Sequence, residues 1–132
     1  MRKPDWPIIL DREIQAAKIL PFSYGEHDCA TWAFDLRHSL IGGENPADRW
    51  RGRYRTEKGC ARVMKRLGWS TVEEGALELL GNPLASVLMA QRGDIVLMDG
   101  ALGICIGSEA AFVGVNGLEA SPLRACQTAW RV

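Results

Sequence analysis

The sequence predicts an α+β protein in which N-terminal helices are followed by a small antiparallel sheet. As far as residue 81 the apolar residues recur at helical spacing, and from Val87 onward they form short runs between turn signals. Two of these signals, Asp99-Gly100 and Asn116-Gly117, are typical of two-residue hairpins. Because helices precede a strand meander and no repeat, linker or low-complexity tract divides the chain, we expect a single domain over residues 1–132.

Four helices are expected, and each has a start or stop signal. Pro21 ends the first, Asp28 can cap the second and Thr56 can cap the third. Thr71 and Glu74 together form a capping box for the fourth. The expected ranges are residues 6–20, 28–40, 57–67 and 72–80.

The second part of the chain is expected to supply strands joined by tight turns. Arg92-Gly93-Asp94 leads into a buried apolar run, and Asp99-Gly100 turns the chain back into the next one. Cys105 lies within this returning run and is expected to be a small core residue. The expected strands are residues 95–98, 102–106, 110–115, 118–123 and 129–132.

The composition argues against several functional classes. Sixteen basic and sixteen acidic residues cancel, which argues against a nucleic-acid protein that works through bulk charge. No apolar stretch is long enough for a membrane span or develops into a signal peptide, so we expect synthesis and folding in a cytoplasm. The four cysteines form no closely spaced pair, so we expect neither a metal site nor another cofactor.

The strongest functional signal is His27-Asp28-Cys29, which follows the loop Ser23-Tyr24-Gly25-Glu26 and opens the second expected helix. A cysteine at a helix N-terminus lies at the positive end of the helix dipole, which favours the thiolate. A papain-like enzyme places its nucleophile in this way. The tripeptide therefore raises the question whether a base and an orienting group accompany Cys29.

Three motifs, in the right order, resemble the NlpC-type family of papain-like cell-wall peptidases. That family has an Asp-Cys pair at the start of a helix, later a Gly-Asp strand, and then a strand that begins with the catalytic His. The resemblance implies a papain-related fold and a cysteine nucleophile at Cys29. The corresponding segments here are Tyr24-Gly25-x-x-Asp28-Cys29, Gly93-Asp94-Ile95-Val96 and Leu102-Gly103-Ile104-Cys105-Ile106-Gly107.

Over nearly its whole length the chain also resembles a small family that is encoded in tail-tip gene clusters of siphophages and their prophages. This resemblance implies a role in the virion tail, with other tail-tip proteins such as the hub or the central fibre as partners. The segments that carry it are His27-Asp28-Cys29, Arg51-Gly52-Arg53-Tyr54, Gly93-Asp94, Leu102-Gly103-Ile104 and Trp130-Arg131-Val132.

The catalytic pattern is incomplete when it is carried over residue by residue. The position of the family's catalytic His is Ala101, and its third polar group falls near Val113. Neither side chain can accept a proton or orient an imidazole. One local alternative remains, in which His27 folds back onto Cys29 and Asp28 orients its ring. In the other interpretation His27 and Asp28 only cap the helix and bond loop amides.

A second candidate surface lies at residues 48–55, where arginines alternate with other residues. If this segment is extended, its arginines share one face, and the interleaved aromatic residues suit a protein interface or a single-strand nucleic-acid platform. The alternative is a solvated loop whose aromatic side chains lie in the core. The candidate interface residues are Arg49, Trp50, Arg51, Arg53, Tyr54, Arg55, Trp130 and Arg131.

From these observations we expect a structural or adaptor component of a phage tail tip, built on a degenerate NlpC-like fold and without hydrolase activity. It would lie in the virion tail, after a period in the host cytoplasm during assembly, and would bind tail proteins and no nucleic acid. The first alternative is an active peptidase or amidase that cleaves peptidoglycan with Cys29 and His27. The second is a non-catalytic assembly factor or cell-wall binding domain.

Overall fold

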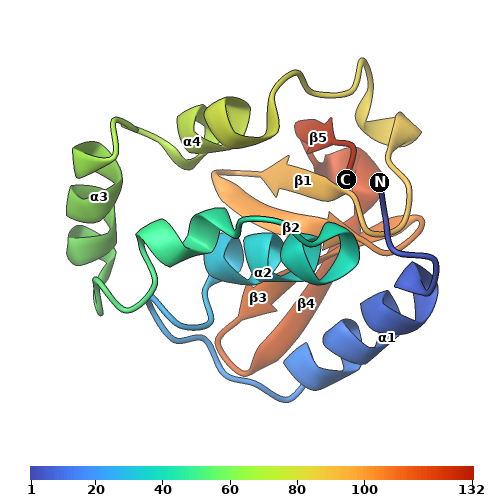
Figure 1. The fold of residues 1–132 in the computed structure, drawn as a ribbon, viewed down its shortest axis with the longest axis horizontal. Helices are drawn as coiled ribbons and strands as arrows, with labels where there is room; N and C mark the ends of the chain where they lie inside the picture. The colour runs from blue at the N-terminus through green and yellow to red at the C-terminus, as the bar shows by residue number, and fades with distance from the viewer.

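Four helices precede five strands in a computed structural model that describes all of residues 1–132 (Figure 1). The α+β class and the order of the elements are as the sequence predicts. The helices are α1 (Trp6–Ala17), α2 (Cys29–Ile41), α3 (Glu57–Arg66) and α4 (Val72–Leu80), with short 3-10 turns η1 (Pro46–Arg49), η2 (Val87–Met89) and η3 (Leu123–Ala125). The strands are β1 (Ile95–Met98), β2 (Ala101–Cys105), β3 (Glu109–Gly114), β4 (Gly117–Pro122) and β5 (Thr128–Trp130).

The strands form one antiparallel sheet in the order β4-β3-β2-β1-β5. Strands β1 to β4 make a meander, and β5 returns to pair with β1 on the opposite edge. Asp99 and Gly100 are the two turn residues between β1 and β2, where Met98 pairs with Ala101. Both have positive φ, 49° and 82°, as a type I′ turn requires. This predicted hairpin is confirmed.

The second predicted hairpin exists, but its turn lies one residue earlier than predicted. Gly114 pairs with Gly117, so the turn residues are Val115 and Asn116. Gly117 belongs to β4 and is required for a different reason. A Cβ at this position would lie 2.3 Å from the carbonyl oxygen of Lys18, in addition to the positive φ of 137°. The glycine therefore allows a close approach between two distant parts of the chain.

The first helix ends at Ala17, three residues before the predicted end. Ile19 and Leu20, which lie inside the predicted range but beyond this end, are 82% and 44% exposed. Pro21 disfavours helical geometry in the residue before it. Beyond this point the chain runs to the β3–β4 hairpin, where the Phe22 amide donates to the Val115 carbonyl at 3.3 Å.

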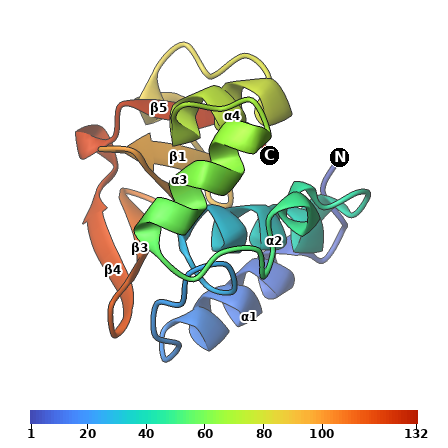
Figure 2. The ribbon, with the colours of Figure 1, turned by 90° about the vertical axis from the view of Figure 1, so that its left-hand side faces the viewer.

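Alternate residues of the strands supply two separate cores, one on each face of the sheet. Ile95 and Leu97 belong to the large core beneath the helices, and Val96 to the small one. Figures 1 and 2 show α2 lying along the sheet, with α1 beside α2. The small core is closed by the segments around η2 and η3, which were not predicted as elements. Cys105 is fully buried in it, as expected.

Candidate functional site around Cys29

Asp28 is the N-cap of α2, which confirms the capping interpretation of this residue. The backbone of Asp28 is extended, and its side chain accepts a hydrogen bond from the Thr31 amide at 2.9 Å. The preceding loop is closed by a bridge between Ser23 and His27, whose backbone groups bond to each other in both directions. Cys29 is therefore held as the first residue of the helix, where the motif predicts it.

The second carboxylate oxygen of Asp28 is also occupied. It accepts hydrogen bonds from the Gly25 amide at 2.9 Å and from the Tyr54 hydroxyl at 2.6 Å. Burial and the bond with Asp28 both raise the pKa of the Tyr54 phenol, which keeps it a proton donor. The Gly25 carbonyl in turn accepts from the Gly52 amide at 3.0 Å. The carboxylate thus joins the loop before α2 to the turn before α3, a contact that no local pattern of residues indicates.

The Cys29 thiol is not activated. Its sulfur lies 3.7 Å from the Val113 carbonyl oxygen, to which it donates. Burial raises the pKa of the Cys29 thiol to about 11, the Asp28 carboxylate adds to this effect, and backbone hydrogen bonds offset only part of it. The expectation that the helix N-terminus favours the thiolate is therefore wrong for this residue. Burial has the largest influence on this thiol, and a neighbouring anion acts in the same direction.

No hydrogen bond joins His27 to Cys29 or to Asp28. Its Nε2 is buried without a hydrogen-bond partner, and burial lowers the pKa of the imidazole. The three residues of the alternative catalytic group are adjacent in the chain, but their side chains do not form a relay. His38 lies nine residues along α2, about 14 Å from Cys29 by helical rise.

The two positions that correspond to the missing catalytic groups lie on opposite faces of the sheet. Val113 belongs to the large core, against which Cys29 packs. The Val113 carbonyl accepts the hydrogen bond from the Cys29 thiol. Ala101 packs against the small core on the other face. The structure therefore brings Val113 to Cys29 but does not bring Ala101 there.

An open hollow of about 490 Å³ lies at the β3–β4 hairpin, next to the Cys29 site. Its charged wall group is Glu119, which sequence reasoning did not single out. The Glu119 carboxylate contributes to the raised pKa of Cys29 and thus further disfavours the thiolate. The hollow is lined by Phe22, Tyr24, Val113, Gly114, Val115 and Glu119, so no imidazole or amine faces it.

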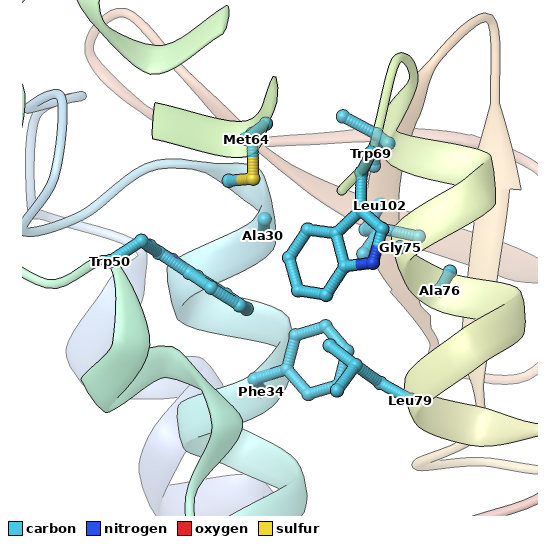
Figure 3. Close-up of a pocket in the computed structure, with 10 residues that line it drawn as sticks. Ala30, Phe34, Trp50, Met64, Trp69, Gly75, Ala76, Leu79 and Leu102 are labelled. Carbon is cyan, nitrogen blue, oxygen red and sulfur yellow. The ribbon is translucent and has the colours of Figure 1, made fainter. Parts of the chain in front are cut away.

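The aromatic residues of the second candidate surface lie in the core. Trp50 and Tyr54 are 1% and 5% exposed, and the Trp50 indole donates to the Thr31 hydroxyl at 3.1 Å. Figure 3 shows Trp50 facing Phe34 and Trp69 around a cavity of about 20 Å³, which has room for little more than one water molecule. The expectation that these aromatic side chains form an interface is wrong, because packing against α2 takes them inside.

The arginines of this segment do not share one face of an extended chain. Residues 46–49 form η1, and a turn follows. Arg51 is half-buried and paired with Asp35, from Nη1 to Oδ2 at 3.1 Å, whereas Arg49, Arg53 and Arg55 are exposed. The last two candidates also differ from each other: Trp130 is fully buried and Arg131 is exposed.

The chain contains no group of three or more His, Cys, Asp or Glu side chains that could hold a metal ion. No helix has the length and apolar character that crossing a membrane requires. Among known proteins, one family model, described as a domain of unknown function (DUF6950), matches residues 1–132. No curated protein and no solved structure matches the chain.

Proposed function

We propose that this protein, which belongs to the DUF6950 family, is a non-catalytic adaptor of a siphophage or prophage tail tip. In this proposal the chain retains an NlpC-like scaffold, has lost the cysteine peptidase reaction, and binds neighbouring tail proteins such as the hub or the central fibre. The location in a tail rests on the resemblance carried by the motifs of the sequence. The absence of a reaction rests on the geometry around Cys29.

The state of the Cys29 thiol is the observation that carries the proposal. With its pKa raised to about 11, the Cys29 thiol stays protonated near neutral pH, and the thiolate is the nucleophile. A general base contributes about 10²–10⁴-fold to such reactions, and no imidazole bonds to this sulfur. Asp28, which could orient an imidazole, already binds Gly25, Thr31 and Tyr54. These residues suit a structural role at the start of α2.

The test is incubation of the purified protein with peptidoglycan and with isolated stem peptides, beside a Cys29→Ala variant. We expect no release of products above the level of the variant, measured by liquid chromatography and mass spectrometry. Turnover that depends on Cys29 would instead support the active peptidase or amidase, and His27→Ala would then show whether His27 is its base. An active NlpC-type peptidase serves as the positive control.

A second measurement distinguishes the tail component from the assembly factor. If the protein is a structural adaptor, mass spectrometry of purified virions from its phage will detect it at a fixed ratio to other tail proteins. Its presence in infected cells together with its absence from virions would contradict the adaptor role and support an assembly factor.

A further inference from the structure

The neutral net charge of the chain conceals a strong local imbalance. Residues 49–66 contain eight of the sixteen basic residues and only one acidic residue, Glu57. This segment therefore carries a formal charge of +7, and the rest of the chain carries −7. The segment comprises the end of η1, the turn that follows and all of α3. Figure 2 looks onto α3, which lies on the outside of the molecule.

Seven of these eight cations are exposed and form no salt bridge within the chain. The eighth is Arg51, which is paired with Asp35 and Asp48. We call the seven the basic ridge. They are Arg49, Arg53, Arg55, Lys58, Arg62, Lys65 and Arg66.

The backbone beneath the basic ridge is fixed. Trp50 and Tyr54 anchor the turn through their bonds to Thr31 and Asp28. Thr56 caps α3 by accepting from the Gly59 amide at 3.0 Å, and the inner side of the helix is buried. A surface whose backbone is already ordered loses little backbone conformational entropy when a partner binds.

The basic ridge costs free energy in the isolated protein. Lys58 and Arg62 are four residues apart on α3, as are Arg62 and Arg66, and like charges at this spacing repel each other. The only acidic residue of α3 is Glu57, which is not three or four residues from Lys58, Arg62 or Arg66, so it forms no helical pair with them. An anionic partner would relieve the repulsion.

We propose that the basic ridge docks on a carboxylate-rich patch of a neighbouring protein. This inference rests on the proposed adaptor role and names the surface and the chemistry of its partner. Five of the seven cations are arginines, whose planar guanidinium groups bind carboxylates in pairs of hydrogen bonds, as Arg51 does with Asp35. Arginine is enriched at protein interfaces, whereas lysine is depleted there.

Two observations favour a compact protein patch over a nucleic acid. The aromatic side chains of the segment are buried, so no exposed ring is available for stacking on bases. Exposed carboxylates lie directly beside the ridge in the sequence, at Asp48 before it and at Glu73 and Glu74 in the first turn of α4. A long polyanion would meet these carboxylates as well as Glu57, whereas a patch about as long as α3, about 15 Å, would meet Glu57 alone.

The experiment measures fluorescence anisotropy of a labelled six-residue glutamate peptide, which is about 20 Å long when extended, and of a labelled DNA duplex of 20 base pairs, both in 150 mM NaCl. The test variant carries Arg53→Glu, Lys58→Glu and Arg62→Glu. The matched control reverses three exposed cations elsewhere, Arg12→Glu, Lys18→Glu and Arg124→Glu, so that the net charge changes equally. Circular dichroism checks that each variant folds. If the charge-reversal variant does not fold, it is replaced by a neutral variant with Arg53→Gln, Lys58→Gln and Arg62→Gln.

We expect the peptide to bind about tenfold more weakly to the ridge variant than to the native chain, with much less change in the control. Equal weakening in both variants, or no binding to the native chain, would overturn the proposal. So would tighter binding of DNA than of peptide that depends on the ridge, or self-association in light scattering that only the ridge variant abolishes. Cys29-dependent hydrolysis would overturn the adaptor role but would leave these binding results unchanged.

Discussion

Two buried aspartates, Asp28 and Asp94, are held in different ways. Asp94 is fully buried and bonds to a cation, since its Oδ1 lies 2.9 Å from Nη2 of Arg2. It also accepts from the amides of Val132 and Gln91 at 2.9 and 2.8 Å. Asp28 is 6% exposed, and its hydrogen bonds come only from neutral donors. Both residues belong to the motifs that resemble a peptidase family.

The difference determines what each charge does to its surroundings. The Arg2 guanidinium balances Asp94 together with Arg131, whose Nε lies 3.6 Å from Oδ2. Gly93 makes room for Arg2, because a Cβ there would lie 3.0 Å from Nη1 of Arg2. The charge of Asp28 has no such partner and adds to the raised pKa of Cys29. An Asp-Cys motif can therefore hold a helix in place and at the same time suppress its own thiol.

Of the substitutions that test this comparison, we expect Asp94→Ala to lower the stability of the protein most. Asp94→Ala leaves the largely buried Arg2 guanidinium without its carboxylate and should lower the free energy of unfolding by about 3–5 kcal/mol. Urea unfolding followed by tryptophan fluorescence measures this change. Asp11→Ala, at an exposed position on α1, is the control and should change stability by less than about 0.5 kcal/mol. A loss below about 1 kcal/mol at Asp94 would contradict the structural role of its ion pair.

Asp28→Ala should have a smaller effect, about 2–3 kcal/mol, because it removes a helix cap and leaves only neutral donors unpaired. Tyr54→Phe removes a single donor from the same carboxylate and should cost about 1 kcal/mol. The same unfolding measurement applies to both. If Asp28→Ala costs more than Asp94→Ala, the distinction between neutral donors and a cation does not govern these two sites.

The smallest expected effect is on the reactivity of the thiol. Asp28→Asn keeps an acceptor oxygen at the helix cap but removes the charge, so the pKa of Cys29 should fall from about 11 and its alkylation at pH 8 should become faster. Glu119→Gln should act in the same direction but more weakly, because Glu119 contributes least to the raised pKa. Iodoacetamide labelling across pH, with Cys29 quantified by peptide mass spectrometry, measures both. Unchanged labelling in Asp28→Asn would mean that burial alone controls this thiol.

Local sequence rules predict the features that depend on neighbouring residues. The caps at Asp28, Thr56 and Thr71 and the turn at Asp99-Gly100 are present where the residue types place them. Each requires only a few consecutive residues to have the right geometry. For this reason the order of helices and strands and the α+β class follow from the sequence.

Features that join distant residues could not be predicted in this way. The Arg2–Asp94 pair spans 92 residues and the Tyr54–Asp28 bond spans 26. The environment of Cys29 depends on Val113 and Glu119, which reach it only because β3 packs against α2 and pairs with β4. The position of Cys29 at a helix N-terminus is visible in the sequence, whereas the burial that raises the pKa of its thiol arises from tertiary packing. The charge of residues 49–66 is also visible in the sequence, but its exposure is known only once Trp50 and Tyr54 are seen to point inward.

The position of Arg2 has a consequence for the connectivity of the domain. Its Nε donates to the Val132 carbonyl at 3.0 Å, so residues 2 and 132 are in contact, and Figure 1 shows the chain entering and leaving at one place. A short peptide could join these residues into a closed ring, with new ends opened at the exposed turn of Val115 and Asn116. For the same reason, the whole domain could be inserted into a surface loop of a larger protein, because the two ends of that loop need not move apart to hold it.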